Sequence, residues 1–285
     1  MGTQTVEVLR HDHEVMALGR SDLDITASSQ VREVFENLRP DYVINAAAYT
    51  NVDGAEEEQK QAFDINYEAV KILASTAHEY DSFFIHFSTD YVFDGKSKRP
   101  YIEDDGPNPL NVYGITKARA DASIIDHCKR FAIFRVAWVY DQVSNNFPNK
   151  ILKAAAERPS LDVVADQWGT PTSADFIAEI VSQFIHKHSM RDSLIGAGIY
   201  NLVPDGTTNW HDFAQYLISG AIIRGYDLMC APDHVRAIEM SMLSQKATRP
   251  LCSILNNQKL QTALGVKFAS WQYYADRFLD RYKLS

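Results

Sequence analysis

Cysteine and long apolar runs are both scarce in this chain of 285 residues. Its three cysteines, Cys128, Cys230 and Cys252, lie far apart and form no Cys-x-x-Cys pair. An odd number of widely spaced thiols excludes a disulfide framework and indicates a reducing compartment. No apolar run has the length that spans a membrane, and no charged-then-apolar leader opens the chain. The sequence therefore predicts a cytoplasmic protein that does not cross a membrane.

Positive charge is also in short supply. The formal net charge is −9, which argues against a general surface for nucleic acid or anionic membrane. His11 and His13 lie two residues apart with no third ligand in evidence, so we expect no metal site. Hydrophobic residues make up 46% and charged residues 23%, which is typical of a folded protein. The length suits one large domain, or one domain with a smaller lobe.

Short apolar runs alternate with longer helical patterns in the first half of the chain. Four runs have the length of buried strands: Val15 to Leu18, Tyr42 to Ala48, Phe83 to Ser88 and Phe131 to Val136. Helical patterns occupy Ser29 to Leu38, Ala55 to His78 and Val112 to His127. The alternation predicts an α/β fold, a Rossmann-like doubly wound parallel sheet. Functional residues then belong at the carboxyl ends of strands, where Asn45 to Ala48 and Ser88-Thr89 fall.

The alternation becomes looser after about residue 145. A polar, turn-rich loop is followed by further elements, at Ala174 to His188, Gly198 to Val203, Trp210 to Ile223, and Ser270-Trp271 to near Tyr282. Asn209 precedes the third of these elements and belongs to the residue types preferred at a helix N-cap. We expect residues 1–145 to form the Rossmann-like domain. Residues 146–285 should form mainly a smaller lobe, with some segments returning to the sheet.

Tyr113 and Lys117 lie four residues apart in the predicted helix from Val112 to His127, so their side chains share one face. A free tyrosine has a pKa of about 10, and a neighbouring ammonium lowers that pKa. Such a pair can move a proton to or from a carbonyl oxygen, typically worth about 10² to 10⁴ in rate. Ser88 or Thr89 can supply a hydroxyl that holds the substrate oxygen. The pair alone is more typical of a solvated helix face than of a catalytic site.

Longer segments decide between these two interpretations. They are Leu23 to Thr26, Asn45 to Asp53, Ala55-Glu56, Ser88 to Phe93, Pro109 to Gly114, Arg135 to Tyr140, Asn145 to Phe147, Asp166 to Thr172 and Arg249-Pro250. In content and order they resemble the dTDP-4-dehydrorhamnose reductases, a branch of the extended short-chain dehydrogenase/reductases. The resemblance implies that Thr89, Tyr113 and Lys117 are the catalytic group. It also implies reduction of the C4 keto group of a dTDP-linked 6-deoxy sugar, with NADPH or NADH as the hydride donor.

The resemblance further implies which residues contact the ligands. Cofactor contacts are expected from Gly2, Arg20, Asp24, Ile25, Ala46, Ala47, Ala48, Tyr113 and Lys117. Substrate contacts are expected from Val52, Ser88, Trp138, Asn145, Asn146 and Phe147. A basic residue at position 20 can meet a 2′-phosphate, which favours NADPH. The expected partner is a dTDP-sugar substrate, without nucleic acid or membrane, and a homodimer stays open.

The chain departs from the family near its N-terminus. The family begins with a strand and a Gly-x-x-Gly-x-x-Gly turn, which seats the cofactor pyrophosphate on a helix N-terminus. Here Gly2 can match only the last or the middle glycine, and the first strand and leading glycine are absent. Loss of a central strand exposes ladder edges and apolar surface. We therefore expect weak cofactor binding and reduced stability for this form, whether a late start or a real loss is the cause.

Two other functions stay open at this stage. Some members of this fold group are non-catalytic regulatory subunits, and the missing glycine turn fits that alternative, although Thr89, Tyr113 and Lys117 argue against it. A sugar-nucleotide epimerase or dehydratase is the other. Related dehydratases carry an Asp-Glu pair after the threonine, whereas this chain has Asp90-Tyr91. That difference favours simple reduction.

Overall fold

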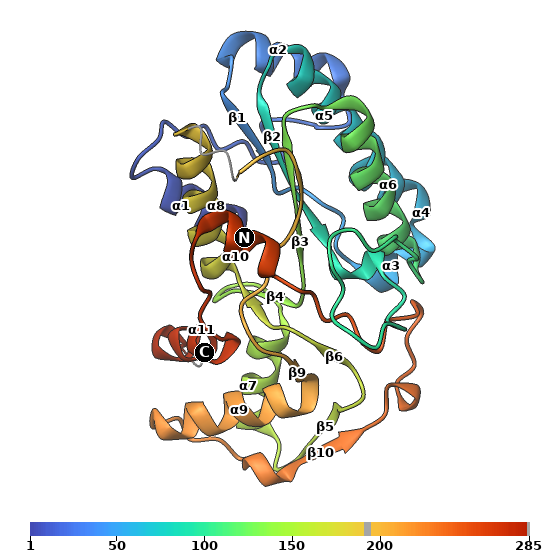
Figure 1. The fold of residues 1–285 in the computed structure, drawn as a ribbon. Coiled ribbons are helices and arrows are strands. Elements are labelled where there is room, and N and C mark those ends of the chain that lie inside the picture. Colours follow the sequence, from blue (N-terminus) through green and yellow to red (C-terminus); the bar gives the residue numbers. More distant parts are fainter. Residues whose placement is uncertain (191–194, 284–285) are drawn as a thin grey trace.

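The computed structural model describes residues 1–190 and 195–283, and a four-stranded parallel sheet lies at its centre (Figure 1). The strand order is β1-β2-β3-β8, formed by β1 (Tyr42–Asn45), β2 (Phe83–Thr89), β3 (Phe131–Val136) and β8 (Gly198–Asn201). Each neighbouring pair is parallel. The predicted α/β class with a parallel sheet is therefore confirmed.

Helices cover both faces of this sheet, as Figure 1 shows. One face packs on α2 (Ser28–Leu38), α5 (Ala69–Glu79) and α6 (Val112–His127), and the other on α1 (Gly2–Leu9), α8 (Ala174–Ser189) and α10 (Gln258–Leu264). Side chains alternate along a strand. Phe84 accordingly packs among the helices of the first face, whereas Phe83 and Ile85 pack among those of the second. Every residue of β2 is buried, as expected for a central parallel strand.

The remaining elements extend the two halves of the chain. The predicted helix from Ala55 to His78 is a succession of helical segments, namely α3 (Val52–Glu57), α4 (Gln59–Phe63), a π-helical turn (Asp64–Glu68) and α5. Later elements are β4 (Val139–Tyr140), α7 (Phe147–Glu157), β5 (Leu161–Val164), β6 (Trp168–Gly169), β7 (Thr172–Ser173), β9 (Thr208–Asn209), α9 (Trp210–Ile223), β10 (Val235–Ile238) and α11 (Trp271–Arg281). Short 3₁₀ turns lie at Asp90–Val92, Pro232–His234 and Met240–Met242.

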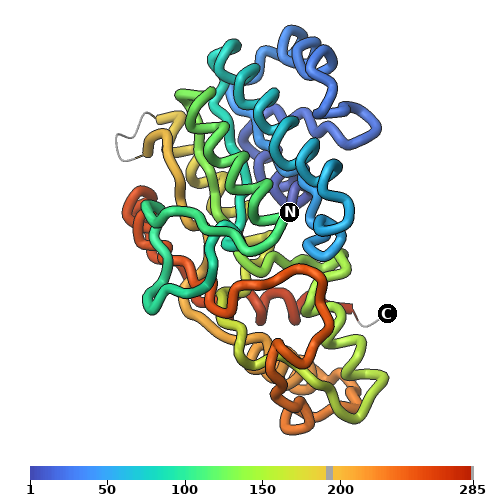
Figure 2. Tube along the Cα trace, turned by 90° about the vertical axis from the view of Figure 1, so that its right-hand side faces the viewer, coloured from blue at the N-terminus to red at the C-terminus, as the bar shows by residue number. Residues whose placement is uncertain are grey.

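The later elements form their own packed clusters. Residues of α7, α9 and α11 pack together, and α7 and α9 also pack on the strand pair β5 and β10. Figure 2 shows the blue α2 region and the orange α9 region at opposite ends of the molecule. The strand β8 and the helices α8 and α10 return to the central sheet. The boundary near residue 145 stays a prediction.

Two helices begin where the sequence predicted, because an asparagine caps each of them. Asn111 accepts a hydrogen bond from Gly114 N at 2.8 Å at the start of α6, and Asn209 accepts one from Asp212 N at 2.8 Å at the start of α9. No helix in the described part of the chain is long and apolar enough to cross a membrane.

One predicted strand is wrong. Residues Val15 to Leu18 are not a strand, and the side chains of Met16 and Leu18 are 63% and 42% exposed. A parallel strand needs a neighbour to hydrogen-bond to, and among the described residues β1 pairs only with β2. The Asp41 carbonyl accepts from Phe83 N at 2.8 Å. In a parallel ladder the next residues alternate, so the backbone groups of Tyr42 and Ile44 face the open side of β1.

Candidate active site

Tyr113 and Thr89 meet where β2 ends against the first turn of α6. The Thr89 hydroxyl lies close enough to the Tyr113 phenol to influence its pKa. The Thr89 hydroxyl also donates to Asp90 Oδ1 at 3.0 Å and accepts from Tyr91 N at 3.2 Å. Burial raises the pKa of Tyr113 to about 12, even though the neighbouring Thr89 hydroxyl acts in the opposite direction. The phenol therefore keeps its proton at neutral pH and is available as a donor.

Gly114 allows Tyr113 to come this close to the end of β2. A Cβ atom at position 114 would lie 2.2 Å from the Tyr91 carbonyl oxygen, so no other residue fits without moving the backbone. The rings of Tyr91 and Tyr113 then pack edge to face, with centroids 6.0 Å apart. The close approach of α6 to the turn after β2 fixes the position of the Tyr113 ring.

Lys117 is buried and its amine is held by β2. Its Nζ donates to the Phe87 carbonyl oxygen at 2.6 Å and lies 2.7 Å from His86 Nε2. Burial lowers the pKa of Lys117 to about 8, and the carboxylate of Asp121, one helical turn further on, opposes that change. The sequence predicted that this amine lowers the pKa of Tyr113, and that prediction is wrong. Burial of the phenol dominates, and it raises the pKa of Tyr113 instead.

Ser88 takes no part in the pairing of Thr89 with Tyr113. Its hydroxyl is buried and donates to Asp121 Oδ2 at 3.0 Å. Arg135 lies 3.4 Å from the same carboxylate oxygen, and it is also buried. Burial raises the pKa of Asp121, and the charge of Arg135 opposes this effect. Of the two hydroxyls that the sequence offered for the substrate oxygen, the structure brings Thr89 to Tyr113 and directs Ser88 to the interior.

A C-terminal segment, residues 246–253, is bound to the same region. Arg249 forms an ion pair with Asp53 at 2.8 Å, and the hydrogen bond from Arg249 is the main reason that the pKa of Asp53 falls to about 2. Ser253 donates to Asp90, whose pKa burial raises to about 6. Asn111 Nδ2 donates to the carbonyl oxygen of residue 248 at 2.8 Å. The segment therefore holds together the start of α3, the turn after β2 and the start of α6.

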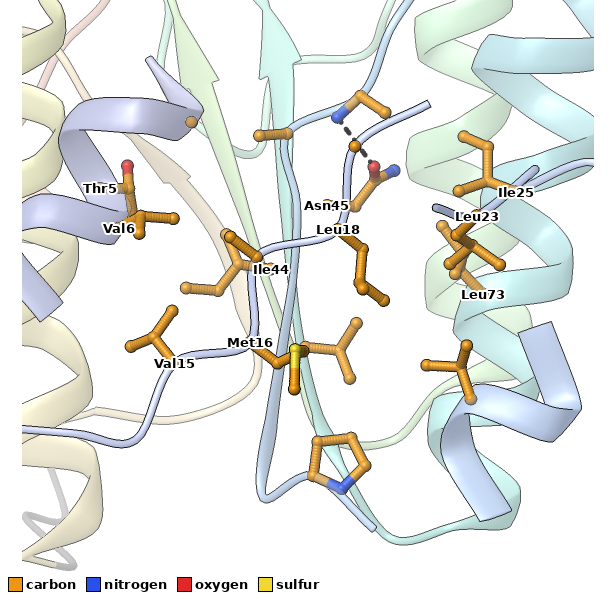
Figure 3. Close-up of a pocket in the computed structure, with 18 of the residues that line it drawn as sticks. Thr5, Val6, Val15, Met16, Leu18, Leu23, Ile25, Ile44, Asn45 and Leu73 are labelled. Carbon is orange, nitrogen blue, oxygen red and sulfur yellow. Dashed lines mark hydrogen bonds between the residues drawn. The ribbon is translucent and has the colours of Figure 1, made fainter. Parts of the chain in front are cut away.

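A cavity of about 1700 Å³ opens beside β1. It is larger than the roughly 300–1,000 Å³ that ligand pockets usually have. Figure 3 shows Val15 and Ile44 on its α1 side, Leu23 and Leu73 on the opposite side, and Met16 between them. The open edge of β1 and apolar side chains from both helical layers form its walls.

Most residues predicted to bind the cofactor line this cavity. They are Gly2, Arg20, Asp24, Ile25, Ala46, Ala47 and Ala48, whereas Tyr113 and Lys117 are not among its lining residues. Gly2 lies at the start of α1, where an added Cβ would touch the Ala46 side chain at 3.4 Å. The Asp24 carboxylate accepts from the backbone and hydroxyl of Thr26 at 2.9 and 2.7 Å. The structure thus gathers at one cavity residues that come from four segments of the chain.

The residues predicted to bind substrate are divided between ring stacking and helix capping. Trp138 has a φ of +45° and stacks on Trp210, with centroids 3.5 Å apart, and Phe147 packs against Trp210 at 4.4 Å. Asn146 caps α7, and its amide donates to the Asp141 carbonyl oxygen at 2.7 Å. Asn145 is exposed in the same loop.

Val52 opens α3, which Asn51 caps. The following residue, Asp53, binds Arg249. Val52 therefore lies beside the segment 246–253.

Sequence reasoning missed His86, Asp53 with Arg249, and the pairing of Trp138 with Trp210. His86 alone carried a local signal, because it is the one ionisable side chain in the run from Phe83 to Thr89. Asp53 and Arg249 lie 196 positions apart, and no local pattern links them.

Comparison with known proteins assigns the chain to a family. A family model described as the RmlD substrate binding domain matches residues 1–284. The chain is 37% identical to the dTDP-4-dehydrorhamnose reductase of Shigella flexneri over 257 residues, which cover 90% of this chain and 85% of that protein. The chain belongs to the dTDP-4-dehydrorhamnose reductase family.

Solved structures of this family have the same fold. A dTDP-4-dehydrorhamnose reductase from Clostridium acetobutylicum matches with a TM-score of 0.89 at 30% identity, covering 98% of this chain and 94% of that one. The enzyme of the same name from Bacillus anthracis, in complex with NADP, matches with a TM-score of 0.87 at 30% identity and the same coverage.

Proposed function

We propose that this protein reduces the C4 keto group of dTDP-4-dehydro-L-rhamnose to the hydroxyl of dTDP-L-rhamnose with NADPH, or with NADH. The observation that carries the proposal is that the side chains of Thr89 and Tyr113 meet at the carboxyl end of β2. Ligands of doubly wound sheets bind at that edge. Relatives named for this reaction, and one solved with NADP, support the substrate and the cofactor.

Tyr113 is the proton donor in this mechanism. Reduction of a ketone produces an alkoxide at the former carbonyl oxygen, and the alkoxide needs one proton. Because the pKa of Tyr113 is raised to about 12, the phenol is protonated at neutral pH and can donate. Thr89 places a second hydroxyl beside this phenol. Positioned donors of this kind stabilise charge as it develops.

Lys117 supplies positive charge behind the tyrosine. Its pKa of about 8 leaves the amine mostly protonated at neutral pH. This ammonium lies one helical turn after Tyr113, on the same face of α6. The carboxylate of Asp121 keeps that ammonium charged in spite of its burial.

The residues around the cavity fit a dinucleotide. Arg20 can pair with a 2′-phosphate, and Ala46 and Ala47 have side chains small enough for a ligand to approach the end of β1. Gly2, at the N-terminus of α1, leaves room for a phosphate there. The bound reduced nicotinamide supplies the hydride. The cavity has a single glycine at the helix start and an open strand edge, so we infer weak binding of the dinucleotide.

Tyr113→Phe tests the proposed reaction. With the 4-keto sugar nucleotide generated in situ, the parent should oxidise NADPH, and the variant should lose about 10² to 10⁴ in rate because the proton donor is gone. Tyr200→Phe removes the hydroxyl of another buried tyrosine, which bonds the Gly196 carbonyl oxygen far from the site, and should keep the parent rate.

Two outcomes would contradict these proposals. A folded parent that oxidises no NADPH would overturn the reductase assignment and favour a regulatory subunit. A micromolar dissociation constant for NADPH, measured by nicotinamide fluorescence, would contradict weak binding while leaving the reaction intact.

A further inference from the structure

His86 is a fully buried imidazole that links the cofactor cavity to the catalytic lysine. It lies in the middle of β2, between β1 and α6. Its Nδ1 is 3.2 Å from Asn45 Nδ2, and its Nε2 is 2.7 Å from Lys117 Nζ. Phe84 stacks on the ring, with centroids 6.2 Å apart. Burial of a polar ring without hydrogen bonds is costly, so both of these contacts matter to the fold.

We propose that His86 is a positioning residue for Lys117, and that the tautomer of its ring follows the protonation of the lysine amine. The inference deepens the proposed function and rests on it, since the direction of the amine matters only if Tyr113 donates a proton. The positioning role follows from the geometry of the amine, and the tautomer coupling follows from the partners of the imidazole.

The amine of Lys117 is held by two neighbouring residues of one strand. An ammonium has three N–H donors. The Phe87 carbonyl oxygen takes one at 2.6 Å, and His86 Nε2 lies 2.7 Å away, where it can take another from the ammonium. Two fixed bonds leave a single direction for the third. Without the imidazole, Nζ would keep one anchor and could rotate around it.

The ring can accept from Lys117 in only one of its neutral tautomers. Burial, together with the charge of Lys117, holds the pKa of His86 well below its usual range, so the ring carries one proton. If Lys117 is an ammonium, Nε2 accepts and Nδ1 holds the proton, which then needs the amide oxygen of Asn45. If Lys117 is neutral, Nε2–H donates to the amine, and Nδ1 accepts from the Asn45 amide nitrogen.

The orientation of the Asn45 amide depends on the tautomer of His86, and Asn45 is part of the cavity wall. Its Oδ1 accepts from Ala47 N at 3.0 Å when the amide nitrogen faces His86, and Figure 3 shows that bond beside the cavity. In the opposite orientation of the amide, the oxygen turns to the imidazole and the Ala47 N–H is released. Ala47 is a lining residue. One proton on Lys117 therefore changes which donor the end of β1 presents to a bound dinucleotide.

Other charged groups near Lys117 do not replace His86. Asp121 faces the lysine from the same helix, but its Oδ2 is taken by Ser88 at 3.0 Å and lies 3.4 Å from Arg135 Nε. Arg135 belongs to β3. The hydrogen bonds recorded for Lys117 Nζ both come from β2. Asp121 thus sets the charge of the amine, while His86 and Phe87 set its direction.

Nitrogen NMR of the imidazole tests the tautomer without any enzyme assay. In histidine-labelled protein free of cofactor, titrated from pH 6 to pH 10, the His86 ring should stay neutral. Its proton should move from Nδ1 to Nε2 as the pH passes about 8, where Lys117 loses its charge. A ring that becomes charged near pH 6.5, or that keeps one tautomer over the whole range, overturns the coupling. Because no turnover is measured, this result is independent of the proposed reaction.

Two variants test the positioning role. His86→Leu removes the acceptor, and we expect kcat to fall about 10- to 100-fold, as for a misplaced catalytic group. The KM for the sugar should change little, and the alkaline limb of the pH profile should move to lower pH. His86→Gln keeps an oxygen that can accept from the amine and should retain kcat within about threefold.

His188→Gln is the matched control. That ring is partly buried and packs on Phe83. It bonds Tyr42 at the opposite end of the sheet, so we expect parent kinetics. A folded His86→Leu variant with the kcat and pH profile of the parent overturns the positioning role. Equal losses in His86→Leu and His86→Gln overturn it as well, because they would show a purely structural requirement for the ring.

Discussion

The two sides of the central sheet differ in strand pairing and in burial. On the β2–β3 side, six residue pairs are in register, and Phe83 to Phe87 are buried under helices on both faces. On the β1 side, the strand has four residues and one neighbour, and a cavity of about 1700 Å³ follows it. The hydroxyls proposed for catalysis belong to the first side, and most of the predicted cofactor contacts belong to the second.

The geometry of the proposed proton donor and the affinity for a dinucleotide therefore depend on different parts of the sheet. The proton donor rests on tightly packed elements, so its geometry depends little on the open edge. Affinity for a dinucleotide depends on the walls of the cavity, which are less completely formed. We therefore expect changes on the β2 side to affect stability and catalysis, and changes on the β1 side to affect mainly ligand affinity.

A pair of alanine substitutions gives the largest contrast. Phe134→Ala removes a fully buried ring from β3, and we expect the free energy of unfolding to fall by about 3–5 kcal/mol. Met16→Ala changes a side chain that is 63% exposed, and the loss should stay within about 0.5 kcal/mol. Urea denaturation followed by circular dichroism measures both. Similar losses would show that the open side is as well packed as the closed one.

Lys117→Met should abolish activity and yet stabilise the protein. The folded pKa of Lys117 is about 8 and its ordinary value is 10.5, so the unfolded chain binds the proton more tightly between these values. The lysine therefore costs stability below pH 8, and the cost shrinks as the pH rises toward 10.5. We expect a gain of about 1–3 kcal/mol at pH 7 that declines by pH 10. A gain that is independent of pH would contradict burial of the charge as its cause.

Amide exchange should distinguish the two edges of β1. In the parallel pattern Val43 N–H faces β2, whereas Ile44 N–H faces the cavity. We expect Ile44 to exchange at least about tenfold faster than Val43, because only Val43 is closed off by a ladder hydrogen bond. Hydrogen–deuterium exchange read by NMR resolves the two amides. Equal protection would show that the open edge has a partner in solution.

The smallest expected effect concerns the choice of cofactor. Arg20 is exposed at the rim of the cavity, where it can pair with a 2′-phosphate. Arg20→Ala should weaken NADPH binding by about 1.5- to fivefold, the range of an exposed ion pair, and should leave NADH unchanged. Fluorescence titration with each cofactor provides the comparison. Equal weakening for both would assign Arg20 to another part of the dinucleotide.

Sequence patterns were sufficient where the local signals were complete. The helix Val112–His127 and the strand Phe131–Val136 have the predicted bounds, because Asn111 caps the first and the second is apolar at every position except Arg135. The segment from Val15 to Leu18 has an equally apolar pattern and still forms no strand. A strand depends on a partner from elsewhere in the chain, and apolar composition alone does not provide one.

The candidate site shows the same limit. The residue types at Thr89, Tyr113 and Lys117 were apparent from the sequence, but the direction of the lysine amine was not. That direction depends on His86 and Phe87, which lie 31 and 30 positions away and contact Lys117 only after β2 and α6 have packed. The raised pKa of Tyr113 also follows from burial, which only the assembled structure determines.

The bonds from Ser253 to Asp90 and from Arg249 to Asp53 also affect the order in which the protein matures. During synthesis, β2 and α6 leave the ribosome long before residues 249 and 253 exist. The nascent chain can therefore assemble Tyr113 and Thr89 early, but the carboxylates beside them wait for their partners until translation is nearly finished. Ribosome-bound intermediates should then contain Tyr113 and Thr89 in place, whereas the bonds from Ser253 and Arg249 form only on release.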